Sequence, residues 1–267
     1  METMKLTENK KSSKGVIIGL LLFFIISGTI LFFAIRAEEE PTVVGTNSND
    51  VQTQNLVDIE SVDKEALLEK NKNISYKVID NKITDKSNLK MKANMTLPVI
   101  SIEDEELTNI NQDINKYYTE MFASLKEKMS SASSNYTYTV TYNVYDNMVE
   151  ENKIISVTIY ERIVDDSAKK NTMNKIKTYN IDAANKEQIT QSNNIAQILF
   201  GKDYKTIIRN EIKDYVVSNN MMKESEFNYT YTGVEPFYIK NNEFHLIFNE
   251  DELADSKYGV LDITIKN

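Results

Sequence analysis

One long apolar stretch near the start of the chain limits its possible folds more than any other feature. Residues 15–35 read GVIIGLLLFFIISGTILFFAI and carry no charge over 21 positions. A helix of about 20 such residues crosses the hydrocarbon core of a bilayer. We therefore predict a transmembrane helix at 15–35. A cleaved signal peptide is the alternative, but its apolar core covers only about 7–15 residues. Cleavage after Ala37 would also place the bulky Ile35 where a small residue is preferred.

The charges on the two sides of this stretch predict its orientation. The first 14 residues contain four lysines and two glutamates, a net charge of +2, whereas Arg36 is followed by Glu38, Glu39 and Glu40. Positively charged flanks stay in the cytoplasm. We therefore expect a cell-membrane protein with a cytoplasmic tail at 1–14 and an extracellular C-terminal part. Because the whole chain carries −9, the part after residue 14 carries −11, and such an acidic domain favours a basic partner.

Composition excludes several classes of site. The chain has no cysteine, which excludes disulfides, thiolate nucleophiles and cysteine-bound zinc. It has 31 basic and 40 acidic residues, and only Arg36, Arg162 and Arg209 are arginines. A nucleic-acid-binding domain shows clustered basic residues, so we expect no nucleic-acid partner.

The chain after the apolar stretch divides into a polar linker and a folded domain. Residues 36–73 contain Pro41 and Gly45 but no aromatic residue, which is typical of a flexible stalk. A short helix starting at Ser61 is expected in its second half. From residue 74 to 267, regular apolar patterns predict an extracytoplasmic folded domain.

Two kinds of periodicity alternate within this domain. Apolar residues recur at every second position, as in half-buried strands, in segments 89–99, 136–146, 153–164, 174–182, 228–240, 243–248 and 259–265. Helical spacing predicts a helix starting from a capping box at Ser101 and Asp104, a short helix at 195–200 that ends at Gly201, and a helix after Asp203. Runs of strands and helices, rather than repeated β-α-β units, indicate an α+β fold with an antiparallel sheet packed against amphipathic helices.

The segment NYTYTVTYNVYD, residues 135–146, raises the question of whether its tyrosines bind a ligand. Tyr136, Tyr138 and Val140 fall on one face of the strand, and Thr137 and Thr139 on the other. Large apolar residues prefer burial. We therefore predict that Tyr138 lies in the core and that this strand is scaffold.

The residues available for catalysis are few. His245 is the single histidine, and no Gly-x-Ser-x-Gly motif or glycine-rich phosphate loop is present, so a serine triad or a nucleotide site is not indicated. Paired carboxylates could hydrolyse glycosides, but Glu103–Glu106 and Glu250–Glu252 are better explained as a helix start and a solvated turn. We predict no catalytic residue, no cofactor, no metal site and no enzymatic activity.

A polar turn between two predicted strands is the expected place of ligand contact. Its charged residues are Asp165, Asp166, Lys169 and Lys170. The lysines stand where a calcium loop needs oxygen ligands and a glycine, which argues against a metal there. We therefore interpret the turn as a ligand-contact loop.

The C-terminal third resembles the extracellular domain of the lysozyme-sensing anti-sigma factor RsiV and the accessory module of the peptidoglycan deacetylase PdaC. The matching positions are Tyr179, Asn180, Asp182, Ile189, Thr190, Leu199, Phe200, Tyr204, Phe248, Asn249, Glu252, Leu253, Ala254 and Gly259. The resemblance continues more weakly back to residue 74. It implies an extracellular α+β domain with peptidoglycan or a lysozyme-like protein as its partner.

Three functions follow from these features as hypotheses. The leading one is a membrane-anchored, non-catalytic protein that binds or senses a ligand in the bacterial cell envelope. The alternative is an RsiV-like regulator that responds to lysozyme, although 14 mostly polar cytoplasmic residues offer little apolar surface for covering a sigma factor. The third is an enzyme that acts on glycans through surface carboxylates.

Overall fold

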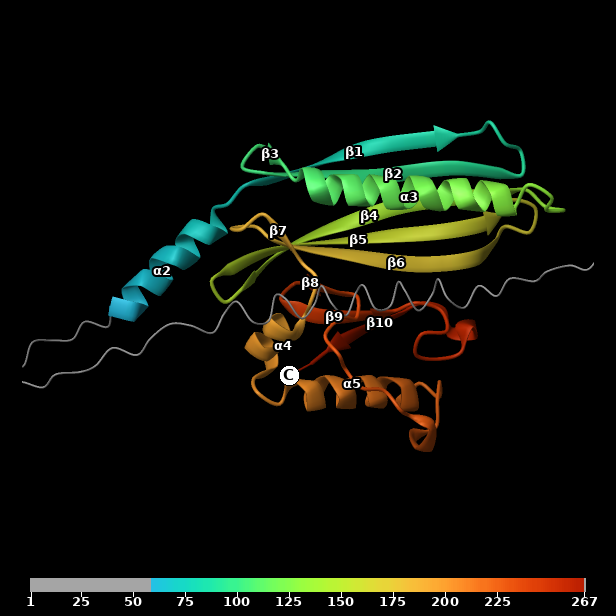
Figure 1. Ribbon diagram of the computed structural model, residues 1–267. Coiled ribbons are helices and arrows are strands. Elements are labelled where there is room, and N and C mark those ends of the chain that lie inside the picture. Colours follow the sequence, from blue (N-terminus) through green and yellow to red (C-terminus); the bar gives the residue numbers. More distant parts are fainter. Residues whose placement is uncertain (1–58, 267) are drawn as a thin grey trace, which may run out of the picture. The chain divides into compact units, whose positions relative to one another are not determined.

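The computed structural model describes residues 59–266, in which four α-helices pack with two β-sheets (Figure 1). The helices are α2 (Ile59–Lys72), α3 (Thr108–Lys128), α4 (Asn193–Phe200) and α5 (Tyr204–Ser218). The strands are β1 (Tyr76–Asp85), β2 (Met91–Ile102), β3 (Glu105–Glu106), β4 (Tyr136–Val149), β5 (Asn152–Asp165), β6 (Lys170–Asp182), β7 (Glu187–Ile189), β8 (Phe237–Lys240), β9 (Glu243–Phe248) and β10 (Leu261–Ile265).

The predicted tail and transmembrane helix lie outside the described residues. Within 59–266, no helix combines the length and the apolar character needed to cross a membrane. The short helix expected in the stalk is present as α2, and it begins two residues before Ser61. Its C-terminal end is held by the domain, because Asn71 Nδ2 donates to Glu151 O at 2.8 Å and Lys153 Nζ donates to Lys72 O at 3.2 Å.

The larger sheet has seven strands and is mixed, so the predicted antiparallel sheet is confirmed for all its strand pairs except one. Its order is β1-β2-β4-β5-β6-β7, with β3 added to β2. Strands β2 and β4 run parallel and the other pairs are antiparallel. Parallel neighbours need a long crossover connection. Helix α3 supplies this crossover between β2 and β4, and it lies across one face of the sheet (Figure 1).

The first core fills the space between α3 and this sheet. Tyr138 is 0% exposed, which confirms its predicted burial. The strand predicted at 89–99 is confirmed for its inward positions from Met91 to Leu97, whereas Val99 is only half-buried, and Leu89 precedes β2 and is 73% exposed. From α3, Ile114 and Tyr118 are fully buried against the strands. Alternating strand residues and one helical stripe therefore form this core, as their spacing indicates.

The predicted start of α3 at Ser101 was wrong. Ser101 belongs to β2, and the helix begins at Thr108. Glu103 and Asp104 both have positive φ, 51° and 64°, and they form a two-residue turn between β2 and β3. A tight hairpin of this length suits paired left-handed residues, so the acidic run closes a hairpin instead of capping a helix.

The second core lies between the three-stranded sheet and helices α4 and α5. This sheet has the order β10-β9-β8 and is antiparallel. Phe244 and Leu246 of β9 pack in the same cluster as Ile208 and Ile212 of α5. Helix α4 ends at Gly201 with a positive φ of 74°, as predicted for a glycine cap.

The segment before β8 is a loop, although its sequence predicted a strand from residue 228. The Glu235 carboxyl group accepts hydrogen bonds from Thr232 N at 2.9 Å and Gly233 N at 2.7 Å. Gly233 has a φ of 89°, and a Cβ atom there would collide with the side chain of Asn193. A left-handed glycine and this carboxyl group turn the chain, so pairing begins only at Phe237.

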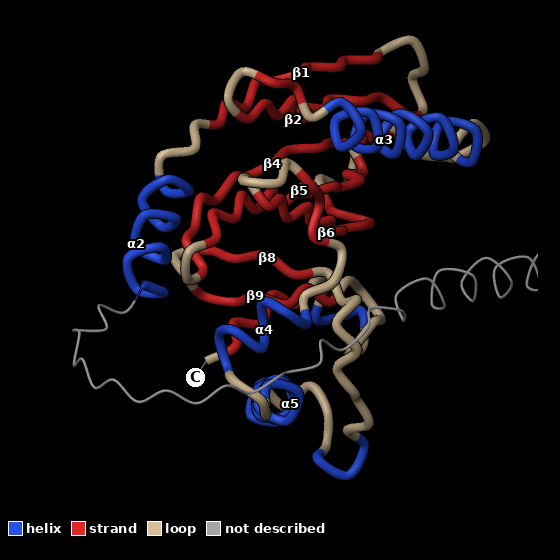
Figure 2. Tube along the Cα trace, turned by 60° about the vertical axis from the view of Figure 1, so that its left-hand side comes forward, coloured by secondary structure: helices blue, strands red, loops and turns tan. Residues whose placement is uncertain are grey.

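A buried polar seam joins the two sheets on the face of the large sheet opposite α3. Strand β8 forms one edge of the small sheet, and its free backbone groups bond to side chains of the large sheet. Asn180 Nδ2 donates to Phe237 O at 2.7 Å, and Ile239 N donates to Ser156 Oγ at 3.0 Å. Asn147 Nδ2 donates to Ile239 O at 2.9 Å. These side chains complete an edge that would otherwise be unpaired, and Figure 2 shows β8 beside the large sheet.

Candidate ligand groove

The four residues of the predicted contact loop lie together at the tip of the β5–β6 hairpin. The Asp165 carboxyl group accepts from the backbone N–H groups of Ala168 at 3.0 Å and Ser167 at 2.8 Å. These bonds, that of Ala168 first, lower the pKa of Asp165. Asp166 Oδ2 lies 3.2 Å from Lys92 Nζ. Asp165 therefore holds the hairpin turn, and Asp166 ties the hairpin to β2.

The two lysines of this tip are exposed, and their side chains make no hydrogen bond or ion pair with another described residue. Lys169 has a positive φ of 55°, as the tight turn requires, and Lys170 begins β6. A ligand role for the four-residue loop stays a prediction.

A groove runs along β4, β5 and β6 on the face opposite α3. Its free volume is about 360 Å³. The lining residues are Thr141, Asn143, Tyr160, Glu161, Arg162, Asn174, Lys175, Ile176 and Val260. The side chain of Glu161 bonds to Tyr117 of α3. Strand alternation therefore directs its neighbours Tyr160 and Arg162 to the groove face.

The strand register orders the groove side chains into rows. Thr141 is paired with Tyr160, and Tyr160 with Ile176. The next row pairs Arg162 with Asn174. Directly paired residues on one face have Cβ atoms about 4.5–5.5 Å apart. A hydroxyl group, a tyrosine ring, a guanidinium group and an amide thus lie side by side.

Tyr160 connects the groove to the small sheet. Its hydroxyl oxygen accepts from Thr158 Oγ1 at 3.2 Å and from Asn143 Nδ2 at 3.4 Å. Burial, together with the hydrogen bond to Tyr160, raises the pKa of Tyr145. The ring of Tyr145 stacks on Tyr238 with 5.4 Å between centroids. A row of aromatic rings therefore extends from the groove floor into the seam.

Arg162 is the groove residue whose side chain is free to bind a ligand. It is exposed, and within residues 59–266 its guanidinium group has neither a hydrogen-bond partner nor an ion-pair partner. The neighbouring Glu161 carboxyl group is occupied on the other face, where it accepts from Tyr138 Oη at 2.7 Å. Glu250 Oε1, near the groove, accepts from Asn174 Nδ2 at 3.2 Å. A free guanidinium group can bind a carboxylate through two parallel hydrogen bonds.

His245 lies on the face of the small sheet opposite Phe244 and Leu246, and it is buried there as a structural residue. Its Nδ1 is 3.0 Å from Asp262 Oδ1, and its ring stacks on Tyr238 with 4.5 Å between centroids. Tyr238 Oη donates to the other Asp262 oxygen at 2.6 Å. Burial, and then this bond, raise the pKa of Tyr238. The described residues include no cluster of three or more side chains suited to hold a metal ion.

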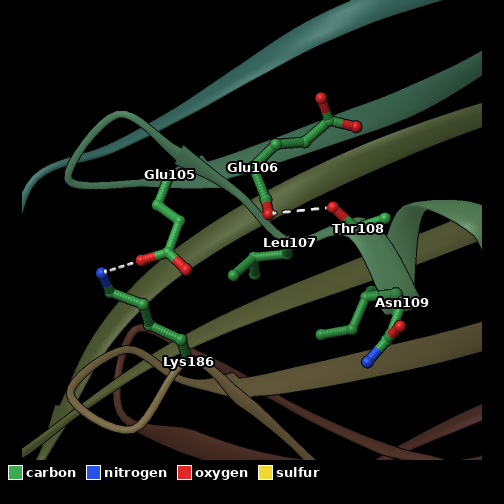
Figure 3. Close-up of a pocket in the computed structure, with 7 residues that line it drawn as sticks. Glu105, Glu106, Leu107, Thr108, Asn109 and Lys186 are labelled. Carbon is green, nitrogen blue, oxygen red and sulfur yellow. Dashed lines mark hydrogen bonds and ion pairs between the residues drawn. The ribbon is translucent and has the colours of Figure 1, made fainter.

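A second hollow of about 240 Å³ lies at the start of α3 (Figure 3). The first turn of α3 has no side-chain cap, so its backbone N–H groups favour an anion. Lys186, however, already binds Glu105 at 2.7 Å and Glu103 at 3.5 Å. These acids repel an anion, and the lysine charge is already paired. The hollow is therefore a weaker candidate than the groove.

Sequence reasoning did not identify the groove, although the signal was present. The alternation that buries Tyr138 places Thr141 and Asn143 on the other face of β4. From the sequence alone, these residues indicate only the outer face of a strand whose other face packs in the core. The groove also needs β5, β6 and the segment before β10, and only the fold brings these together.

Comparison with known proteins finds solved structures with weak similarity to this chain. No protein-family model and no curated protein matches the chain. A solved structure of a DUF3298 family protein from Pseudomonas aeruginosa is 11% identical, with a TM-score of 0.45, over 73% of this chain and 91% of that chain. A DUF3298 family member from Bacteroides fragilis is also 11% identical, with a TM-score of 0.37, over 72% and 90%. Similarity this low assigns no site residue, and the resemblance to RsiV and PdaC stays a prediction.

Proposed function

We propose that this chain is a single-pass membrane protein whose α+β domain faces the bacterial cell envelope and binds a ligand there without catalysing a reaction. The apolar stretch at 15–35 and its asymmetric flanking charges support the anchor and the orientation. The resemblance to extracellular envelope domains supports the location.

The proposed binding role rests on the groove. It is open to solvent and lined by hydroxyl, amide, aromatic and guanidinium side chains, and the charge of Arg162 is unpaired within the described domain. A few convergent polar groups beside aromatic surface are typical of a ligand site. Its nearest carboxyl groups, those of Glu161 and Glu250, are engaged by Tyr138 and Asn174. The groove therefore offers groups for binding rather than an acid and base pair for hydrolysis.

Two partners fit the envelope. Peptidoglycan presents sugar hydroxyls, amides and carboxylates to the groove. A lysozyme-like protein fits the net charge of −11 that follows residue 14, because opposite charges increase the rate of association. We place peptidoglycan first, since the groove is a local feature whereas the net charge is spread over both the stalk and the domain.

The test uses the full chain, purified in detergent, and sacculi freed of other proteins. We expect saturable binding to the sacculi and no release of soluble muropeptides. Binding to neither sacculi nor lysozyme at up to about 1 mM, which corresponds to only about 4 kcal/mol of affinity, would refute the proposal. Released muropeptides would instead support the glycan-acting enzyme, and lysozyme-dependent shedding of the domain from cells would support the RsiV-like regulator.

The location is tested on cells that express the chain. Protease added to intact protoplasts is expected to digest the domain and to leave a small membrane-bound fragment. A domain that remains fully protected would show that it does not face outwards.

A further inference from the structure

We infer that the groove recognises a carboxylate-bearing glycan, with Arg162 binding the carboxylate and Tyr160, Asn143 and Asn174 binding the sugar units beside it. This inference rests on the proposed function and names the ligand class of the same site. It goes beyond the proposal because it assigns the contact to particular residues and requires a negative charge on the glycan.

The position of Arg162 selects a carboxylate. It lies on the central strand β5 between paired residues of β4 and β6, Thr139 and Asn174. Its planar guanidinium group presents a fork of donors that matches the two oxygens of a carboxylate. Neither a hydrogen bond nor an ion pair within the described domain competes for it.

The side chains beside Arg162 are suited to bind a sugar. Tyr160 is half-buried and occupies the position next to Arg162 on the same face, two residues earlier in β5. A tyrosine ring combines apolar area with a polar edge, which suits the mixed surface of a sugar ring. The amide of Asn143 and the hydroxyl of Thr141 stand beside it as partners for sugar hydroxyls.

The charge around the groove explains why such a ligand would bind here and not elsewhere on the domain. The domain as a whole is acidic and repels anions. Charges separated by more than the Debye length of about 8 Å are largely screened at physiological salt. An anion at Arg162 meets an unpaired cation, and the carboxyl groups of Glu161 and Glu250 beside the groove accept hydrogen bonds from Tyr138 and Asn174. An anion at the start of α3 instead meets Glu103 and Glu105, which already pair with the lysine there.

The experiment measures the affinity of the full chain for a soluble disaccharide muropeptide, which carries carboxylates, and for a neutral chitin oligosaccharide. Arg162→Gln is expected to weaken muropeptide binding by about tenfold or more, because it removes a charge-assisted pair of hydrogen bonds. Arg162→Lys keeps the charge but loses the fork, so it is expected to restore only part of the affinity. The neutral oligosaccharide should bind weakly to every variant.

Lys170→Gln tests the predicted contact loop of the same hairpin. The matched control is Lys116→Gln, which removes the same charge from an exposed side chain of α3, on the opposite face of the large sheet. Both substitutions are expected to leave the affinity unchanged. Arg162 is exposed and unpaired, so unchanged thermal unfolding should accompany the loss of binding in Arg162→Gln. Tyr160→Ala provides a second variant within the groove, and we expect it to weaken binding of the muropeptide as well.

Three outcomes would overturn the inference. One is wild-type affinity in Arg162→Gln while the chain still binds sacculi, which would leave the proposed function standing. Another is a loss of affinity in Lys170→Gln rather than in Arg162→Gln, which would assign the contact to the hairpin tip. The third is tighter binding of a poly(glycerol phosphate) than of the muropeptide, which would show that the groove prefers phosphate.

Discussion

Replacing Tyr138 by alanine is expected to lower the free energy of unfolding by about 4 kcal/mol, because truncating a buried aromatic side chain removes its burial and leaves a cavity. The ring is 0% exposed and stacks on Phe122 of α3 with 6.3 Å between centroids. Its hydroxyl group donates to the buried Glu161 at 2.7 Å. The alanine variant would therefore lose packing between helix and sheet and would also deprive a buried carboxyl group of its shortest hydrogen bond. Urea denaturation of the full chain measures the change.

Tyr138→Phe separates the two contributions. It keeps the ring and removes the hydroxyl group, so we expect a loss of only about 1–2 kcal/mol. Burial, and secondly the charge of Glu161, raise the pKa of Tyr138 far above its usual value. The hydroxyl group therefore remains a donor throughout the physiological pH range. A loss below about 0.5 kcal/mol for Tyr138→Ala, as at exposed sites, would contradict the described core.

Replacing Asn180 by alanine is expected to destabilise the domain by about 3 kcal/mol, because each buried polar group left without a partner costs about 1–3 kcal/mol. Asn180 is 2% exposed. Its amide donates to Phe237 O, and its carbonyl oxygen accepts from Ser156 Oγ at 2.7 Å. The variant would leave a carbonyl group of β8 unpaired inside the protein and would loosen the attachment of the small sheet.

A matched control for Asn180 lies on the same strand. Asn171 of β6 is exposed and its side chain has no hydrogen bond within the described domain. Asn171→Ala is therefore expected to change the free energy of unfolding by less than about 0.5 kcal/mol. Equal effects of the two substitutions would show that the seam contributes little to the attachment of the small sheet.

Much of the fold could be predicted because local patterns of apolar residues determine most of its helices and strands. Alternation identified β2, β4, β5 and β6, and it placed Tyr138 in the core correctly. Helical spacing identified α5, whose buried residues Ile208, Ile212 and Val216 follow one stripe. A glycine after an apolar run identified the end of α4 at Gly201.

The errors occurred where contacts distant in sequence decide the structure. Ser101 and Asp104 fit a capping box, but the pairing of Ser101 with Glu106 turns the segment into a hairpin. The parallel alignment of β2 and β4 depends on the position at which the chain leaves α3. The alternation of residues within a strand carries no information on that position. The groove depends likewise on strand pairing, because Tyr160 and Asn174 carry no distinguishing motif until β5 and β6 lie side by side.

Hydroxyl-radical footprinting of the full chain, with and without a saturating concentration of disaccharide muropeptide, tests the assignment of the groove most directly, because it reports the solvent access of individual side chains. We expect oxidation of Tyr160 and Ile176 to fall several-fold when the ligand binds, while Tyr76 of β1 keeps its rate. Protection at the hairpin tip 165–170 or at the start of α3, with Tyr160 unchanged, would contradict the assignment of the groove as the binding site.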